Sequence, residues 1–524
     1  MESSPFHNVA SLLARSARAW PRLPAVAEGG RVLHDYAALA RRASSLAATL
    51  VAGGLVPGDR VVLVARNLPA YVETLFGCWW AGLVAVPINA KLHPKELAFV
   101  VGDSGARRIF ADDAWRAAIG NGHVDDAAAL PTTALCSREH EALCALPQGG
   151  EPAPVQPGTP AWLFYTSGTT GRPKGVVISH GNLHAMTHAF LADVEAATPG
   201  DALLHPAPLS HGSGLYLLPH VARGAVSVVP ESGGFDADEL CALLAHWDRA
   251  LFFAAPTMVR RFVAAPALAR APLERLKCIV YGGGPMYIED CKAAHAALGP
   301  RLAQIYGQGE SPMTITAMDR ALVADSIARG DDARIGSVGI AQLGVELRIA
   351  DGDDRPLAPG AIGEVQVRGP AVMQGYWRNP AATEATLAGG WLHTGDLGLL
   401  DADGFLTLKD RSKDLIISGG ANIYPREVEE ALLAHPDVAE VAVIGRRHAE
   451  WGEEVVACVV ARHPGEDAAA RVALETALDR HCIDAIARFK RPRAYVFLRE
   501  LPKNETGKVL KIALREIVAG TTID

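Results

Sequence analysis

The sequence lacks the cysteine patterns of a disulfide framework or a zinc site. Its eight cysteines are scattered over 524 residues, with no CxxC pair and no neighbouring run of histidines. Thiols spaced in this way are typical of reduced cysteines, so we expect a cytoplasmic protein. The first residues also lack a basic segment followed by an apolar one, and we expect no secretory signal.

Long apolar runs and an excess of positive charge are missing as well. The most apolar stretch, residues 76–88, is interrupted by glycine and contains Pro87, so it is too short to span a bilayer and we expect no stable membrane insertion. A formal net charge of -8 and a pI near 6.1 argue against nucleic acid as the main partner. We therefore expect a small-molecule partner.

The length of the chain and its pattern of apolar and polar residues predict an α/β and α+β protein with more than one domain. Up to about residue 300, short apolar strands alternate with helical patterns, which predicts α/β layers with largely parallel sheets. Residues 334–368 read as a small β-rich subdomain. After a charged run at 409–414 the pattern becomes α+β, so we predict a body of residues 1–410 and a small, mobile lid of residues 411–524.

A loop rich in glycine and hydroxyl groups lies between two apolar runs at residues 165–175, YTSGTTGRPKG. Hydroxyls donate hydrogen bonds, glycine permits close backbone approach and lysine adds a cation, which together indicate a cradle for a nucleotide triphosphate. It is not a Walker loop, because Pro173 stands where the second glycine would be. The expected phosphate contacts are Thr166, Ser167, Gly168, Thr169, Thr170 and Lys174.

This loop resembles the signature of the adenylate-forming superfamily, which includes acyl-CoA synthetases, adenylation domains of peptide synthetases and beetle luciferases. The resemblance extends from about residue 10 to 515, with the core motifs in the expected order. It implies ATP, Mg²⁺ and, in the acyl- and aryl-CoA ligase branch, CoA as cofactors.

A second motif, residues 306–310 (YGQGE), follows an apolar run at 302–305 and should lie at the carboxyl end of a strand, where α/β sheets bind ligands. A carboxylate beside a triphosphate requires a divalent cation, so Glu310 is predicted to bind magnesium, and Thr166 is assigned as a second ligand. The resemblance implies the same role for Glu310 and places Tyr306 against adenine. The nucleotide contacts expected here are Tyr306, Gly307, Gln308, Gly283 and Gly284, although a plain strand-to-helix turn explains Gly307 equally well.

Asp396 and Arg411 are predicted to hold the ribose. A carboxylate accepts hydrogen bonds from the two sugar hydroxyls, and arginine donates to the same edge. Taken singly both are ordinary surface charges, but the resemblance implies this role for the two positions together.

The predicted lid carries the family's closing motif, LPKNETGK, at residues 501–508. The resemblance implies that Lys508 is the catalytic lysine, which reaches the carboxylate and the α-phosphate and offsets developing charge. It also implies a hinge at Lys413 and a thiol channel lined by Gly419 and Gly420, where side chains would block passage.

Further lid residues resemble the CoA contacts of aryl- and acyl-CoA ligases. Aromatic stacking and arginine suit the adenine and the phosphates of CoA. The residues are Trp451, Phe489, Arg491 and Arg493. Ordinary surface arginines are the alternative interpretation.

The acid should lie where residues 208–214, 281–286 and 311–314 converge. None of the three segments contains lysine or arginine, so a second carboxylate would be buried without a partner. We therefore expect an apolar monocarboxylic acid, aromatic or medium-chain. Arg260 and Arg261 lie outside the three segments and are the residues that could still supply a positive charge to the acid site. His211 matches the family's aromatic position beside the acyl group, and we count it with Lys508 as catalytic.

These patterns together predict an AMP-forming acid–thiol ligase, an acyl-CoA synthetase. The carboxylic acid and ATP would give an acyl-adenylate and pyrophosphate, after which CoA displaces AMP. A freestanding adenylation enzyme that loads a carrier protein is the alternative, and a homodimer is left open. A non-catalytic nucleotide-binding protein is disfavoured, because all the residues named for chemistry are present.

Overall fold

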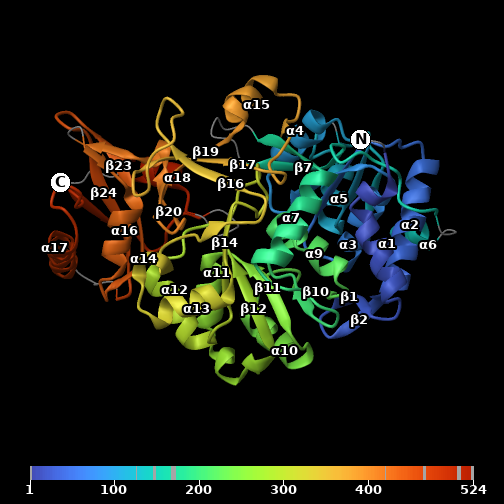
Figure 1. Cartoon of the computed structure of the whole chain (residues 1–524), viewed down its shortest axis with the longest axis horizontal. Helices are drawn as coiled ribbons and strands as arrows, with labels where there is room; N and C mark the ends of the chain where they lie inside the picture. Colours follow the sequence, from blue (N-terminus) through green and yellow to red (C-terminus); the bar gives the residue numbers. More distant parts are fainter. Residues whose placement is uncertain are drawn as a thin grey trace.

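The computed structural model of the chain describes residues 3–125, 127–145, 149–166, 173–418, 421–463, 468–503 and 509–520. These residues form a large body and a smaller C-terminal unit. Figure 1 shows the C-terminal helices and strands at one end of the molecule and the first helices at the other. None of the described helices is both long and apolar enough to cross a membrane. All eight cysteines lie in described residues and are free thiols.

A largely parallel sheet carries the expected phosphate loop. Within the described residues it has seven strands in the order β18-β8-β7-β4-β3-β5-β6. They are β18 (Gly375–Tyr376), β8 (Lys174–Ser179), β7 (Pro160–Thr166), β4 (Val84–Asn89), β3 (Arg60–Ala65), β5 (Arg108–Ala111) and β6 (Thr132–Ala134). The strands from β6 to β7 are parallel, and β8 and β18 are antiparallel additions. Nearly continuous apolar strands such as β3 suit a sheet that is covered on both faces.

A second sheet carries the YGQGE motif at the end of one of its strands. Its nine strands, counted over the described residues, run in the order β15-β14-β13-β12-β11-β9-β10-β1-β2. They are β15 (Ile340–Ala341), β14 (Thr316–Met318), β13 (Leu302–Tyr306), β12 (Leu276–Tyr281), β11 (Ala250–Ala254), β9 (Ala202–Leu204), β10 (Val226–Val229), β1 (Pro24–Glu28) and β2 (Arg31–Asp35). The central strands pair in parallel, as the alternating sequence pattern predicts.

Helices cover both sheets and separate them. They include α1 (Ala10–Ala19), α2 (Tyr36–Ala52), α3 (Pro69–Trp80), α6 (Arg138–Ala145), α7 (His180–Asp193), α9 (Leu217–Ala222), α10 (Ala237–His246), α11 (Pro256–Val263), α12 (Ile288–Leu298), α13 (Arg320–Ala328) and α15 (Pro380–Thr386). Every residue of α3 is buried, and α3 contacts β1 of one sheet and β3 and β4 of the other. A helix that is apolar all round belongs between layers.

The β-rich subdomain is a small antiparallel sheet. The described part of it contains β16 (Glu346–Ala350), β17 (Gly363–Arg368), β19 (Leu392–Leu400) and β20 (Leu406–Arg411), in that order. Two of these strands, β16 and β17, pair within residues 334–368, where the sequence predicts a β-rich subdomain. Arg411, where the lid was expected to begin, is still the last residue of β20.

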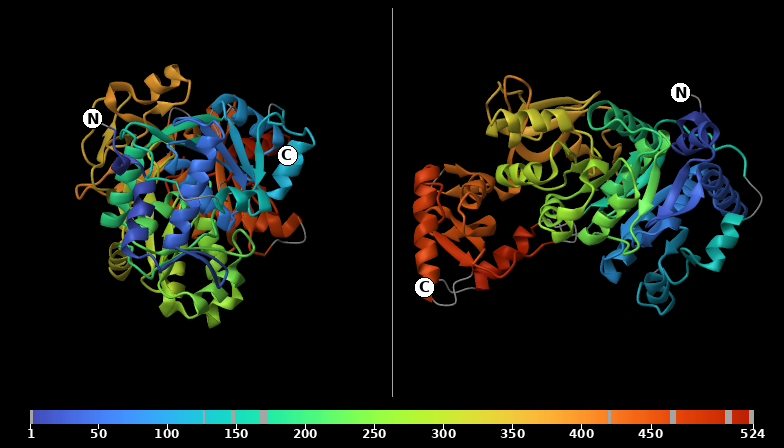
Figure 2. Two further views of the ribbon diagram at one scale, coloured as in Figure 1. Left: turned by 90° about the vertical axis from the view of Figure 1, so that its right-hand side faces the viewer. Right: turned by 90° about the horizontal axis from the view of Figure 1, so that it is seen from below.

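The C-terminal unit has its own core. It consists of β21 (Ile416–Ser418), β22 (Ala421–Ile423), α16 (Pro425–Leu433), β23 (Val438–His448), β24 (Gly452–Ala461), α17 (Ala468–Ala485), β25 (Ala494–Phe497) and α18 (Lys511–Gly520). Val428, Val443 and Val459 are among its buried residues. Figure 2 shows that this unit packs against the body along one side only. The predicted α+β class is confirmed.

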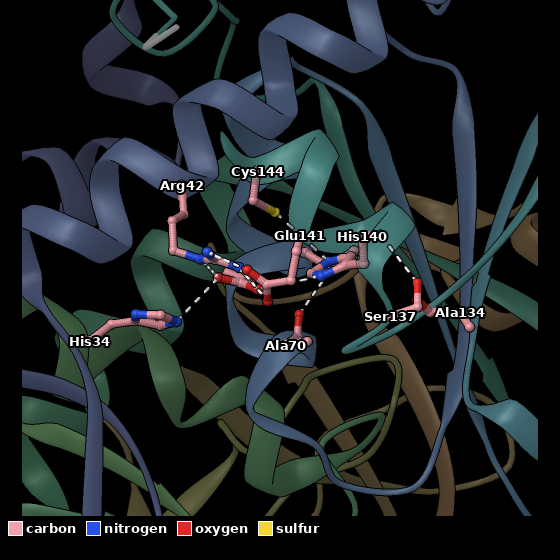
Figure 3. A network of polar contacts seen from close by, with 10 residues as sticks. His34, Arg42, Ala70, Ala134, Ser137, His140, Glu141 and Cys144 are labelled. Atoms are coloured by element: carbon pink, nitrogen blue, oxygen red, sulfur yellow. Dashed lines mark hydrogen bonds and ion pairs between the residues drawn. The ribbon is translucent and has the colours of Figure 1, made fainter. Parts of the chain in front are cut away.

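A buried ionic network holds helices of the N-terminal region together (Figure 3). Arg42 of α2 contacts both carboxylate oxygens of Glu73 of α3, and it also donates to Glu141 of α6 at 2.9 and 3.0 Å. Glu73, His140 and Cys144 place potential metal-ligand atoms within 4.8 Å of one another. Because Arg42 already occupies both oxygens of Glu73, this cluster serves packing.

Removing this arginine should destabilise the fold without touching the expected site. Arg42→Ala leaves the buried Glu73 carboxylate without its counterion, which should cost roughly 3–5 kcal/mol of unfolding free energy. The neighbouring exposed Arg41→Ala is the matched control, and we expect a change within about 0.5 kcal/mol. Thermal unfolding measures both, and equal melting temperatures for the two variants would contradict the assignment.

Candidate active site

A buried carboxylate, Asp396, gathers donors from three separate segments. Tyr306 at the end of β13 donates its hydroxyl to Asp396 Oδ2 at 2.6 Å, and Gln308 Nε2 donates to the same oxygen at 2.6 Å. Arg411 Nε lies 2.9 Å from Oδ1, because β19 and β20 pair these two residues directly. The Asp396 charge raises the pKa of Arg411, and burial raises that of Tyr306. The structure thus brings together four residues that the sequence analysis assigned to the nucleotide.

The turn after β13 requires the glycine that the motif contains. A Cβ on Gly307 would lie 2.7 Å from the backbone nitrogen of Met313, closer than real Cβ contacts allow. Gly309 approaches Thr166, the last residue of β7, so closely that a Cβ would lie 2.7 Å from its methyl carbon. The YGQGE turn therefore packs against the strand that leads into the phosphate loop, which supports the structural interpretation of its glycines, while the nucleotide contact of Gly307 stays a prediction.

Glu310 and Lys174 both contact one tyrosine, Tyr376. The Tyr376 hydroxyl donates to Glu310 Oε1 at 2.8 Å, and Lys174 Nζ lies 4.9 Å from the centre of its ring. The sequence analysis missed Tyr376. The signal that could have found it is the polar segment GYWRN at 375–379, which interrupts a β-rich region.

Glu310 and Thr166 fit a magnesium ion bound together with a nucleotide. Tyr376 occupies one oxygen of the Glu310 carboxylate, and no described residue donates to the other. Magnesium commonly takes only one or two protein oxygens and completes its octahedron with phosphates and water. The second Glu310 oxygen, to which no described residue donates, meets that requirement, and the preceding Gly309 packs on Thr166.

The segment expected to bind the acid packs among apolar side chains, and its histidine is neutral. The rings of His211 and Phe164 meet edge to face with centroids 5.1 Å apart, and a Cβ on Gly212 would lie 2.9 Å from Met313 and 3.0 Å from Phe253. Ser210 Oγ lies 2.8 Å from His211 Nδ1. Burial lowers the pKa of His211 to about 4, so the imidazole is uncharged at neutral pH.

The two arginines that might have supplied a cation to this pocket are engaged elsewhere. Arg260 lies 3.7 Å from Asp290 of α12 and 3.9 Å from Glu440 of β23. The Arg261 guanidinium stacks over Phe235 at 4.7 Å. Arg260 therefore joins the body to the C-terminal unit.

The expected CoA residues divide into two groups. Trp451 stacks on His448 with centroids 4.4 Å apart, and the Arg493 guanidinium lies 4.9 Å from the Trp451 ring. Phe489 is half-exposed. Arg491 instead forms an ion pair with Asp479 of α17. The structure thus joins Trp451 to Arg493 and directs Arg491 to a helix of its own unit.

Several expected site residues lie outside the described residues. They are Ser167, Gly168, Thr169, Thr170, Gly419, Gly420 and Lys508. Their flanks are described: Thr166 pairs with Lys174, Ser418 with Ala421, and Lys503 with Val509. Gly283 and Gly284 are exposed in the turn after β12, and Lys413 is exposed between β20 and β21.

The comparisons with known proteins identify the class. The model of the AMP-binding enzyme family matches residues 13–377, and that of the AMP-binding enzyme C-terminal domain matches residues 427–508. The chain therefore belongs to the AMP-binding enzyme family, the adenylate-forming superfamily expected from the sequence. The predicted enzyme class, an AMP-forming acid–thiol ligase, is confirmed.

Particular relatives cover nearly the whole chain. Feruloyl-CoA synthase of an Amycolatopsis species is 36% identical over 507 residues, which are 96% of this chain and 97% of that protein. The fatty acid–[acyl-carrier-protein] ligase ScoC of Streptomyces coeruleorubidus is 35% identical, covering 95% and 93%. The crystal structure of ATP-bound MatB from Rhodopseudomonas palustris has a TM-score of 0.86 at 30% identity, covering 98% and 99%.

Buried histidines around the acid pocket should make the fold sensitive to acid. Burial lowers the pKa of His205 to about 3 and those of His211 and His220 to about 4. The unfolded chain binds protons near pH 6.5, so each neutral imidazole stabilises the fold above that pH and loses this effect as the pH falls toward 4. Between pH 7 and pH 5 each should cost on the order of 2 kcal/mol of unfolding free energy.

Urea unfolding at pH 7 and pH 5 measures this loss. Ser213 Oγ lies 2.8 Å from His205 Nδ1, and the amide of His205→Asn keeps a partner for it. This variant should reduce the loss of unfolding free energy between pH 7 and pH 5 by roughly 2 kcal/mol. The exposed His123→Asn is the control and should leave it unchanged. A pH dependence that is identical in all three proteins would contradict the prediction.

Proposed function

We propose that the chain is an AMP-forming acyl-CoA synthetase that activates an apolar monocarboxylic acid, aromatic or medium-chain. The acid attacks the α-phosphorus of ATP to give an acyl-adenylate and pyrophosphate. The thiol of CoA then attacks the acyl carbon and AMP leaves. The observation that carries the proposal is the buried cluster of Tyr306, Gln308, Asp396 and Arg411, which lies one turn away from Glu310 and its neighbour Lys174.

The cluster around Asp396 and the neighbouring residues Glu310 and Lys174 have different proposed roles. Asp396 would accept hydrogen bonds from the ribose hydroxyls, with Arg411 donating to the same sugar. Lys174 would hold the β- and γ-phosphates, and Glu310 with Thr166 would hold Mg²⁺, which neutralises charge on the triphosphate when bound. Lys508 is the proposed catalytic lysine, and Gly419 and Gly420 are proposed to line the thiol path.

Several observations support an apolar acid. The pocket around His211 contains Phe164, Phe253 and Met313, and its histidine is neutral. Arg260 and Arg261 have partners outside it. A second carboxylate would be desolvated there without a counterion, which costs several kcal/mol. The similarity to feruloyl-CoA synthase and to a fatty acid ligase agrees with an acid of this kind.

A change of lid position between the two half-reactions is part of the proposal. In this structure Tyr287 of the body donates to Glu429 of α16 at 3.0 Å, and Lys511 of α18 lies 3.5 Å from Asp410. Rotation about Lys413 would have to break both of these contacts.

A cytoplasmic location and a homodimer also remain predictions.

The alternative product is a thioester on a carrier protein. The relative ScoC supports this alternative, because it is named as a ligase that acts on an acyl-carrier protein. Arg493 over Trp451 favours free CoA, because a cation held on an aromatic face offers both charge and stacking surface to a nucleotide.

A pyrophosphate-release assay over a panel of acids tests the function. We expect turnover with apolar aromatic or medium-chain acids and at least a hundredfold lower kcat/KM with dicarboxylates of similar size, since several kcal/mol separate the two. Acyl-CoA should form only when CoA is added. Lys508→Ala is the negative control and should lose pyrophosphate release. Release without any thioester, or preference for dicarboxylates, would contradict the proposal.

The two arginines near the C-terminus distinguish CoA from a carrier protein. Arg493→Ala should raise the KM for CoA about tenfold, because the guanidinium over Trp451 is lost, while acid-dependent pyrophosphate release without CoA stays unchanged. Arg491→Lys is the matched control, since its charge can keep the ion pair with Asp479, and its KM for CoA should stay near the parent value. No effect of Arg493→Ala on CoA would favour the carrier-protein alternative.

A further inference from the structure

One short segment, residues 373–376, connects the loop of Glu310 to the strand of Lys174. The Met373 backbone N–H donates to the Glu310 carbonyl oxygen at 2.8 Å. Gln374 N–H then donates to the carbonyl of Val177 in β8 at 3.1 Å, and Tyr376 pairs with Val176 of the same strand. The segment is therefore fixed by backbone bonds at both ends.

This pairing sets the position of the Tyr376 ring. Lys174 lies two residues before Val176 and so projects from the same face of β8, diagonally across from Tyr376. The ring face, which carries negative charge density, meets the Lys174 ammonium with 4.9 Å between Nζ and the centroid. Its hydroxyl, at the edge of the ring, donates to Glu310 Oε1 at 2.8 Å.

Tyr376 thus contacts two side chains of opposite charge, Lys174 through its ring and Glu310 through its hydroxyl. In the described part of the chain no ion pair joins Lys174 to Glu310. A direct pair would take the lysine from the phosphates and the carboxylate from the cation.

We propose that Tyr376 is a positioning residue that keeps Lys174 and Glu310 apart and directs both toward the triphosphate. The hydroxyl orients Glu310 by one oxygen and leaves the other for the cation, and the ring holds the lysine. This inference rests on the proposed function, because it assumes that ATP binds here with Mg²⁺.

Two substitutions separate the two contacts. Tyr376→Phe keeps the ring beside Lys174 and removes the hydrogen bond to Glu310, whereas Tyr376→Leu removes both. The matched control is Tyr287→Phe, which also deletes a tyrosine–glutamate hydrogen bond, of 3.0 Å, but at the contact between the body and the C-terminal unit. Melting temperatures establish that each variant is folded, and the isosteric Tyr376→Phe carries the test if Tyr376→Leu does not fold.

Calorimetric titration with ATP, once with Mg²⁺ and once with EDTA, gives the readout without any turnover. For Tyr376→Phe we expect the Mg²⁺-dependent gain in ATP affinity to fall about tenfold, a typical effect of losing a residue that orients a metal ligand, with the Kd in EDTA unchanged. For Tyr376→Leu the Kd in EDTA should also rise, by about two- to fivefold, because Lys174 loses its aromatic contact. Tyr287→Phe should match the parent in both solutions.

Two results would overturn the inference. A parental Mg²⁺ effect in Tyr376→Phe would remove the role toward Glu310, and a Tyr376→Leu variant identical to Tyr376→Phe would remove the role toward Lys174. Failure of the proposed function is a separate outcome: a protein that binds ATP with Mg²⁺ as described yet forms no acyl-CoA would refute the synthetase activity and leave this inference standing.

Discussion

The site depends on the need to balance one buried negative charge. Asp396 is nearly inaccessible, and a carboxylate in that position is stable only when donors surround it. Tyr306, Gln308 and Arg411 satisfy this requirement, and they come from β13, the turn that follows it and β20. The β-rich subdomain is thereby held against the end of the nine-stranded sheet. We propose that the same residues bind the nucleotide, in which case the interaction that fixes the subdomain also prepares the site.

A second set of charges holds the C-terminal unit in its present position. Glu429 is buried, accepts hydrogen bonds from Tyr287 of the body and from the backbone of Val443, and lies 3.4 Å from Lys511. Lys511 in turn approaches Asp410. A rotation of the unit relative to the body would break the contacts of Tyr287 with Glu429, of Lys511 with Asp410 and of Arg260 with Glu440. These few polar contacts are the ones that a lid has to exchange when it changes position.

The apolar pocket and the polar cluster illustrate how one protein provides two electrostatic environments side by side. His211 is neutral because burial without a counterion disfavours the imidazolium, whereas Arg411 remains charged because Asp396 pairs with it. The reacting carboxylate would meet the nucleotide where these environments join. An acid with a second charge would have to place that charge on the apolar side.

The sequence by itself determined the family, the α/β and α+β classes and a group of four polar residues, Tyr306, Gln308, Asp396 and Arg411, that the fold brings together. It could do so because the phosphate loop, the YGQGE turn and Asp396 are local patterns whose chemistry is recognisable from adjacent residues. Tyr376 could not be found in this way, since it lies 66 residues from Glu310 and more than three times as far from Lys174 along the chain, and only strand pairing brings the three together. The partners of Arg260, Arg261 and Arg491 were likewise decided by the tertiary structure. A charged side chain can be read from a sequence, but the atom that neutralises it is set by long-range packing.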